Sequence, residues 1–429
     1  MDILIKNGRI IDPSSAMDGI GDILIKDGLI SAVDERVTVR EGAPKIDASG
    51  MLVCPGFIDL HCHLREPGFE DKETIATGTE AAVRGGFTTI CCMPNTEPPL
   101  DSPSILRHLA RIVIDEGRTS VLPVGCVTEG RKGKKLADLV TMHKEGAVAF
   151  SDDGNPVYDD GIMRRALEEG KPLGIPIIDH CEDKILSGKG SMNEGSTALK
   201  LGYTGIPGEA EERMVERDIK LAGETGGWVH IVHVSTAGSV ELVRQGKQSG
   251  INVTAEVTPH HLTLTEQAVI TAGTTAKVNP PLRTERDRLA LIEGLLDGSI
   301  DVIATDHAPH TMADKDCEFE EAAFGISGFE TAFGSLMGLV HQGYFDLAFL
   351  ISRLTCEPAR ILGKNTIGNL SMASEADVTI IDPDAEWIVD TSKFASKGRN
   401  TPLAGEKLRG KVVATVVGGR LVYLDEKSC

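Results

Sequence analysis

Residues 55–68 read PGFIDLHCHLREPG, in which a short apolar run leads directly into two histidines at alternate positions. Successive side chains point to opposite faces of a strand, so Asp59, His61 and His63 share one face, and Arg65 joins them if the extended chain continues. Two neutral imidazoles on one face can bind a single cation. A pair of hydrogen-bonded histidines at a polar strand end is the alternative, and this stretch alone leaves both open.

Four later segments repeat the pattern of a strand-like run that ends in metal-capable side chains. They are GAVAFSDDG (146–154), PIIDHCE (176–182), WVHIVHVS (228–235) and DVIATDHAPH (301–310). Apolar runs of this kind alternate with helical stretches over residues 101–116, 160–169, 209–223 and 236–248. Such alternation implies βαβ units and a parallel sheet. Because reactive residues follow the carboxyl ends of several strands, we predict an α/β fold built on a (β/α)8 TIM-like barrel.

A Rossmann fold is not supported by the sequence. No GxGxxG motif follows an early strand, and Gly85–Gly86 is better explained as the end of a helix.

The two ends of the chain differ from its middle. Short strands are expected over residues 3–6, 22–25, 29–33, 377–382, 411–417 and 421–423. Asn7–Gly8 and Asp27–Gly28 are typical hairpin turns. We therefore expect residues 1–51 and 364–429 to combine into one small β-sandwich beside a barrel domain over residues 52–363.

Composition narrows the classes of function. The net charge of -20 over 429 residues argues against electrostatic binding to nucleic acid or to a membrane surface. Residues 1–6 are too charged for a signal sequence, and no apolar run approaches the roughly 20 residues of a membrane helix. The nine cysteines lack CxxC spacing, so buried thiols are expected at Cys62, Cys91, Cys92 and Cys181. These features favour a cytoplasmic protein.

The residue types at the strand ends suit a particular metal. A set rich in histidine that also contains aspartate is typical of a catalytic zinc, which keeps one coordination position for water. A structural zinc site would more often use cysteines, and Cys62 points to the strand face opposite to the two histidines that flank it.

Taken together, the motifs resemble those of class I dihydroorotases in the cyclic amidohydrolase superfamily. The resemblance extends nearly from end to end, through GFIDLHCHLREPG (56–68), GGFTTICCMPNTEPP (85–99), FSDDGNPV (150–157), DHCED (179–183), HIVHVSTAGS (230–239), EVTPHHL (256–262), NPPLR (279–283) and ATDHAPH (304–310). It implies the reversible, zinc-dependent cyclisation of N-carbamoyl-L-aspartate to L-dihydroorotate in de novo pyrimidine biosynthesis.

The resemblance also implies roles for individual residues. The implied metal ligands are His61, His63, Asp153, His180, His233 and Asp306. Asp153 is implied as the shared carboxylate, and Asp306 as the catalytic proton carrier. The implied substrate contacts are His63, Arg65, Asn95, Asn279, His310 and the backbone near Phe324 and Gly325.

One feature departs from the wider superfamily. Many relatives bridge two metals with a carbamylated lysine at the end of the fourth strand, whereas residues 146–153 contain no lysine. Asp153 must take that place, and its side chain is shorter. One or two zinc ions per chain are therefore both compatible with the sequence.

Several residues have a simpler explanation. Arg65 has the planar fork that suits a carboxylate, but an ion pair with Glu66 or Glu70 is the alternative. Asn95 is equally explained as a turn residue. Three further side chains near the motifs have no implied metal role. Packing around the site is preferred for His260 and His261, and a structural hydrogen bond for Asp152. Three other histidines are expected on helices, namely His108, His143 and His341.

Other functions remain in competition. A hydantoinase or allantoinase shares the expected fold but does not explain Arg65. A non-catalytic partner of aspartate transcarbamoylase should lack several implied ligands, yet all six are present. Assembly with that transferase, or into a homo-oligomer, is compatible with the resemblance. The acidic segment over residues 311–323 is expected to be a lid over the substrate, with a solvated loop as its alternative.

Overall fold

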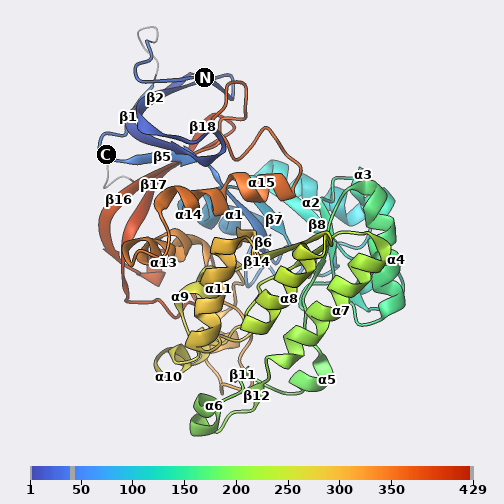
Figure 1. The fold of residues 1–429 in the computed structure, drawn as a ribbon. Helices are drawn as coiled ribbons and strands as arrows, with labels where there is room; N and C mark the ends of the chain where they lie inside the picture. The colour runs from blue at the N-terminus through green and yellow to red at the C-terminus, as the bar shows by residue number, and fades with distance from the viewer. Residues whose placement is uncertain (1, 39–43, 426–429) are drawn as a thin grey trace.

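The structure is a computed structural model that describes residues 2–38 and 44–425. Eight parallel strands, hydrogen-bonded in the order β15-β14-β13-β10-β9-β8-β7-β6, form its centre (Figure 1). A parallel bridge joins Cys62, at the end of β6, to His307, in the segment that follows β15, so the sheet curves into a barrel. The strands are β6 (Phe57–Cys62), β7 (Phe87–Cys92), β8 (Ser120–Gly125), β9 (Ala149–Ser151), β10 (Ile177–Asp179), β13 (Val229–Ile231), β14 (Val253–Val257) and β15 (Val302–Ile303).

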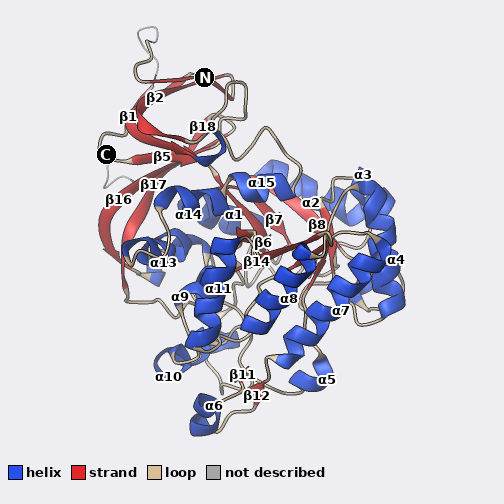
Figure 2. Ribbon diagram, viewed as in Figure 1, coloured by secondary structure: helices blue, strands red, loops and turns tan. Residues whose placement is uncertain are grey.

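A helix follows each barrel strand and packs around the outside of the barrel (Figure 2). These helices are α1 (Ile75–Arg84), α2 (Pro103–Glu116), α3 (Leu139–Lys144), α4 (Asp160–Gly170), α7 (Glu209–Thr225), α8 (Ala237–Gln248), α11 (Glu285–Asp297) and α13 (Phe329–His341). The predicted (β/α)8 TIM-like barrel is confirmed. The four helices predicted from the sequence differ from α2, α4, α7 and α8 by no more than a few residues at either end.

Shorter elements lie in the segments that connect the main strands and helices. They are η2 (Glu129–Arg131), η3 (Lys171–Leu173), α5 (Lys184–Ser187), β11 (Met192–Asn193), α6 (Ser196–Leu201), β12 (Gly205–Ile206), α9 (Pro259–Thr263), α10 (Ala268–Ala272), η4 (Gly273–Ala276), α12 (Met312–Lys315), α14 (Leu347–Leu354) and α15 (Cys356–Ile361). Within the two described ranges, none of the helices combines the length and apolar character required to span a membrane.

Local chemistry explains where helices begin and end. Thr74 caps α1 in a reciprocal capping box with Thr77, and Asp159 caps α4 through the backbone N–H of Ile162. Gly85 ends α1, and Gly86 then adopts a φ of 87°, which a residue without a Cβ tolerates best. The prediction that Gly85–Gly86 ends a helix is therefore confirmed.

Strands from both termini lie in one further sheet of eight strands, at the upper left of Figure 1. Its order is β18-β17-β16-β5-β1-β2-β3, and β4 pairs with β1. These strands are β1 (Ile3–Asp12), β2 (Met17–Lys26), β3 (Leu29–Asp34), β4 (Lys45–Asp47), β5 (Leu52–Pro55), β16 (Val378–Ile388), β17 (Lys407–Val417) and β18 (Arg420–Leu424), with short helices η1 (Pro13–Ser15) and η5 (Thr391–Lys393).

One of the two predicted hairpin turns is wrong. Asn7–Gly8 lies inside β1, where Asn7 has a φ of 59° and the pairing with β2 shifts register, so the dipeptide forms an irregularity and the strand continues. The chain reverses instead at η1. Asp27–Gly28 does connect β2 and β3, as predicted. Because β5 pairs with β1 and β16, the terminal sheet extends to residue 55, past the boundary expected at residue 52.

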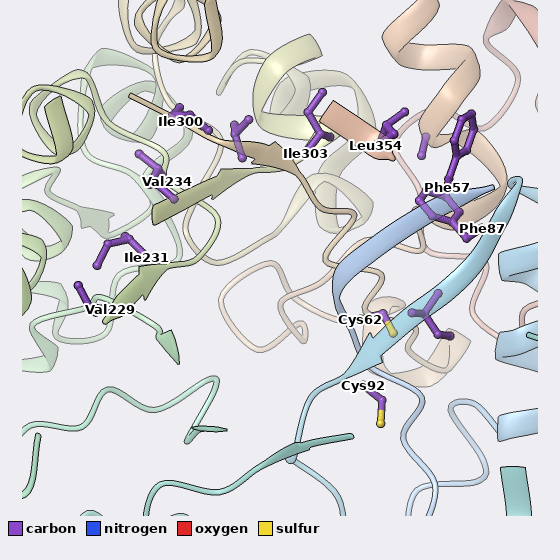
Figure 3. Packing of buried hydrophobic residues seen from close by; sticks show 14 of the residues in the cluster. Phe57, Cys62, Phe87, Cys92, Val229, Ile231, Val234, Ile300, Ile303 and Leu354 are labelled. Carbon is purple, nitrogen blue, oxygen red and sulfur yellow. The ribbon is translucent and has the colours of Figure 1, made fainter. Parts of the chain in front are cut away.

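Two hydrophobic clusters show how the barrel strands are packed. Phe57 and Phe87, labelled in Figure 3, belong to the cluster between the strands and the outer helices, and the Phe57 ring stacks on Phe333 of α13. Ile58 and Leu60 belong to a second cluster with residues from other barrel strands, inside the barrel. Cys62 lies in the outer cluster, which agrees with its expected orientation away from the neighbouring histidines.

Candidate metal centre and active site

The six expected metal ligands lie together at the carboxyl ends of the barrel strands. His63 Nε2 lies 3.0 Å from Asp306 Oδ1, and His61 Nε2 lies 3.6 Å from the same oxygen. On the other side, His180 Nδ1 faces His233 Nε2 at 2.9 Å. All of these side chains are buried.

Asp153 lies between the two pairs of histidines. Its Oδ1 is 3.5 Å from His61 Nε2 and 3.9 Å from both His180 Nδ1 and His233 Nε2, while Oδ2 is 3.6 Å from His63 Nε2. This central position suits a carboxylate shared by both halves of a metal site.

Irregular backbone turns three of these side chains toward the centre. Ile231 packs outside the barrel and Val232 inside it, so strict alternation would direct His233 outward; instead, His233 has a left-handed φ of 37°. Asp306 likewise has a φ of 46°. In β6 the strand pairing shifts between Asp59 and Cys62, which brings His61 inward. Such conformations cost free energy and often occur at functional sites.

Asp59 does not join the cluster, although simple alternation groups it with His61. Its carboxylate accepts hydrogen bonds from the backbone N–H and the hydroxyl of Thr305, both at 2.7 Å. Asp59 therefore links β6 to the segment after β15.

The electrostatics of the cluster favour a positive charge at its centre. Burial of His61 lowers the pKa of its imidazole. The nearby carboxylates of Asp306, Asp153 and Glu256 have a larger combined effect and raise this pKa to about 10. Burial also opposes ionisation of Asp153 and Asp306, yet the surrounding imidazoles keep the pKa of both carboxyls below the usual aspartate range. The cluster thus combines ionised carboxylates with imidazoles.

The donor atoms fit a divalent metal ion. Among the described residues, His61 Nε2 and Asp153 Oδ1 are buried without a hydrogen-bond partner, which is costly unless another group satisfies them. Imidazole nitrogens with carboxylate oxygens are ligands that zinc accepts. Asp179 and Asp218 belong to a second buried cluster of metal-capable side chains. The guanidinium of Arg217 already supplies a positive charge there, because its Nε lies 2.7 Å from Asp218 Oδ1.

Two carboxylates that the sequence analysis gave no role orient the proposed ligands. Glu256, in the middle of β14, accepts hydrogen bonds from His61 Nδ1 at 2.7 Å and from His230 Nε2 at 3.1 Å. Glu182 lies 3.0 Å from His180 Nε2. A lone glutamate inside the buried strand VTAEV was the available signal for Glu256.

The proposed substrate contacts lie in two groups around the cluster. Arg65 lies beside His310, with 3.3 Å between Arg65 Nη2 and His310 Nε2, and His310 Nε2 is 2.8 Å from the carbonyl oxygen of Phe324. Asn95 approaches the metal ligands directly, since its Oδ1 lies 2.9 Å from His63 Nδ1. Asn279 lies on the opposite side, where its Nδ2 donates to Glu182 at 2.8 Å.

The backbone at Arg65 is not extended, contrary to one expectation. Its φ of 64° turns the chain after β6, and the guanidinium donates to the carbonyl oxygen of Pro309 at 3.2 Å. The alternative partners bind elsewhere: Glu66 accepts the N–H of Ile75, and Glu70 accepts the N–H of Gly68.

The structure also places the residues without an implied metal role. Asp152 accepts a hydrogen bond from the backbone N–H of Thr128 at 3.0 Å, a structural contact of the kind expected. His261 contacts Thr258 Oγ1 and the carbonyl oxygen of Pro280. His260 is buried, and three other histidines lie on helices, namely His108, His143 and His341.

The segment over residues 311–323 is packed against the barrel mouth. Thr311 caps α12, and the buried Lys315 donates hydrogen bonds to the carbonyl oxygens of Thr274, Lys277 and Ala323. The acidic residues Asp316, Glu318, Glu320 and Glu321 are exposed, so the alternative of a solvated loop is also compatible with this arrangement. Movement of the segment as a lid stays a prediction.

The cysteines agree with the expectation of buried thiols. All eight cysteines within residues 2–38 and 44–425 are free, and Cys62, Cys91, Cys92 and Cys181 are buried.

Comparisons with known proteins agree along the whole chain. A family model described as "Dihydro-orotase-like" matches residues 50–239. The dihydroorotase of Pelotomaculum thermopropionicum is 52% identical over 426 residues, covering 99% of this chain and 99% of that protein. The dihydroorotase of Thermoanaerobacter sp. (strain X514) is 49% identical, covering 100% of this chain and 98% of that protein.

A solved structure shows the same architecture at lower identity. The L-hydantoinase (dihydropyrimidinase) from Arthrobacter aurescens superposes with a TM-score of 0.88 at 27% identity, covering 99% of this chain and 96% of that one. Because about half of all residues match curated dihydroorotases over nearly the full length of both partners, the chain belongs to the dihydroorotase family.

Proposed function

We propose that this chain is a metal-dependent dihydroorotase, which interconverts N-carbamoyl-L-aspartate and L-dihydroorotate in pyrimidine biosynthesis. The observation that carries the proposal is the convergence of six metal-capable side chains at the mouth of the barrel, where His61 Nε2 and Asp153 Oδ1 are buried without a hydrogen-bond partner. Full-length identity of about 50% to curated dihydroorotases supports the choice of substrate.

The proposed ligands are His61, His63, Asp153, His180, His233 and Asp306. A zinc ion held by them would lower the pKa of a bound water and polarise the attacked carbonyl group. The chain itself supplies the proton carrier. The Asp306 carboxylate, whose pKa is kept low by neighbouring imidazoles against the effect of burial, accepts a proton from the attacking water and passes it to the leaving ring nitrogen. Ring closure reverses these transfers.

Substrate orientation is assigned to the polar groups around the cluster. Arg65 offers a planar fork to the substrate carboxylate, and its position beside His310 places both donors on one side of the metal ligands. Asn95 contacts His63 and reaches Asp153, so it lies between the substrate side and the metal side. Asn279 and the backbone at Phe324 and Gly325 complete the proposed contacts.

A direct test measures turnover and metal together. The purified chain should convert dihydroorotate and carbamoyl aspartate much faster than it hydrolyses hydantoin or allantoin. Chelation should abolish turnover while most secondary structure remains, because the barrel is held together by strand pairing and packing. Added zinc should then restore turnover. Full activity of metal-free protein, or a clear preference for hydantoin, would contradict the proposal. An inactive chain that still binds metal would favour a non-catalytic partner role.

Finer assignments complete the proposal. The sequence motifs favour class I, with one or two zinc ions. We propose three parts, residues 1–51, 52–363 and 364–429, in which β5 of the second part completes the terminal sheet and this sheet forms a β-sandwich. Free cysteines suit a reducing compartment such as the cytoplasm. We also propose a homo-oligomer that can associate with aspartate transcarbamoylase, for which size measurements with and without that enzyme are the test.

A further inference from the structure

Asn400 reaches into the barrel mouth from the C-terminal part of the chain. Its Oδ1 accepts hydrogen bonds from the backbone N–H of His310 at 3.0 Å and from Ser327 Oγ at 2.9 Å. Its Nδ2 donates to the carbonyl oxygens of Ala308 and Gly325, both at 3.0 Å. Asn400 is only 4% exposed, so water does not replace these partners.

The four contacts use the full hydrogen-bonding capacity of the amide. The oxygen faces two donors and the nitrogen faces two acceptors, so only one orientation of the side chain satisfies all four partners. Neither aspartate nor leucine of similar size can reproduce this pattern. The contacts therefore require asparagine specifically.

These contacts join two segments that approach each other closely. Ala308 N–H donates to the carbonyl oxygen of Ile326 at 2.9 Å. Gly325 has a φ of 147°, and a Cβ there would lie 2.7 Å from the Ala308 carbonyl oxygen, so a side chain would force the segments apart. Asn400 bonds to both segments at this narrow point.

The same contacts control groups assigned to the substrate. Arg65 donates through Nε to the carbonyl oxygen of Pro309, which lies between the two residues that Asn400 binds on that segment. His310 Nε2 contacts the carbonyl oxygen of Phe324 and lies beside the Arg65 guanidinium. A shift of residues 308–310 therefore moves both groups.

We propose that Asn400 is a positioning residue that sets the relative placement of residues 308–310 and 325–327, and thereby the geometry of substrate binding. The inference rests on the proposed function, because it assumes that Arg65 and His310 contact the substrate. Asn400, which lies outside the barrel strands and helices, would thus help to determine which substrate Arg65 and His310 can bind.

The test compares two asparagine-to-aspartate variants. In Asn400→Asp a carboxylate oxygen faces the carbonyl oxygens of Ala308 and Gly325, so the segments should separate. Asn369→Asp is the matched control, since Asn369 also donates to two carbonyl oxygens, at 3.0 and 3.1 Å, and accepts from Ser371 and Ser374. None of its hydrogen bonds involves the proposed site.

We expect Asn400→Asp to raise KM for carbamoyl aspartate about tenfold or more, because small displacements of binding groups carry large penalties. Its kcat should change less than KM, and its zinc content should match that of the wild type. Amide hydrogen exchange should accelerate at Ala308, at His310 and in residues 325–327. The control should leave KM and this exchange unchanged.

Several outcomes would overturn the proposal. The proposal is wrong if Asn400→Asp folds, binds zinc and keeps a wild-type KM. It is also wrong if Asn400→Asp loses zinc while its KM stays at the wild-type value. If Asn400→Asp does not fold, Asn400→Ser removes the contacts without adding a charge, and failure of both to fold would assign Asn400 to overall stability instead. An inactive wild type would refute the proposed function, and the exchange measurement would still report on the segments.

Discussion

Replacing Glu256 by glutamine should weaken metal binding while preserving the fold. Glu256 is fully buried in β14 and accepts His61 Nδ1–H at 2.7 Å and His230 Nε2–H at 3.1 Å. His230 also contacts Thr254 Oγ1 through Nδ1. Because Glu256 binds Nδ1–H of His61, Nε2 is directed at Asp153 and Asp306, and it is the nitrogen that gives up its proton when the ring binds a metal.

Glutamine has nearly the same size, but its amide presents one oxygen and one NH2 group. It can accept from only one of the two imidazoles and carries no charge. If the NH2 group faces His61, that ring must take the tautomer with Nε2–H, which cannot bind a metal. Loss of such a partner typically lowers metal affinity about 10–100-fold, which corresponds to about 1.4–2.7 kcal/mol.

The assay is a competition titration of zinc against a chelator at constant pH, with turnover measured at saturating zinc. Glu266→Gln serves as the control, since Glu266 is a buried carboxylate that binds Asn193 and Thr197 and no metal ligand. We expect reduced zinc affinity in Glu256→Gln only. Wild-type zinc affinity in a folded Glu256→Gln protein would refute the reasoning that the carboxylate orients His61.

Three further predictions address substrate, proton transfer and stability. Arg65→Lys keeps the charge but loses the planar fork, so we expect weaker substrate binding with zinc retained; an unchanged KM would remove Arg65 from the site. Asp306→Asn should reduce the rate in both directions by about 10²–10⁴-fold with zinc still bound, whereas Asp152→Asn should remain active; near-wild-type rates of Asp306→Asn would assign proton transfer to another group. Burial raises the pKa of Glu330 from 4.5 to about 7, so the folded state holds a proton that the unfolded chain releases. The free energy of unfolding should therefore fall by at most about 3 kcal/mol between pH 5 and 8, and Glu330→Gln should abolish this part of the decline; parallel pH profiles from denaturant titrations would contradict the assignment.

Much of the fold could be predicted from local sequence. Apolar runs such as residues 146–151 and amphipathic stretches such as residues 209–223 have different periodicities, and these mark strands and helices. The position of histidines and aspartates directly after the strands indicated a barrel with its site at one end. Local signals failed where backbone geometry is irregular: Asn7–Gly8 lies within β1, and Arg65 turns away from the extended direction.

The sequence by itself determined the order of strands and helices, the chemistry of the proposed ligands and their common location at the carboxyl ends of the strands, because all three depend on neighbours along the chain. Only the tertiary structure decided which buried groups orient those ligands and loops. Glu256 meets His61 across 195 positions, and Asn400 meets His310 across 90. Closure of the barrel creates these contacts, and the left-handed backbone at His233 and Asp306 is compatible with the fold only because surrounding packing maintains it.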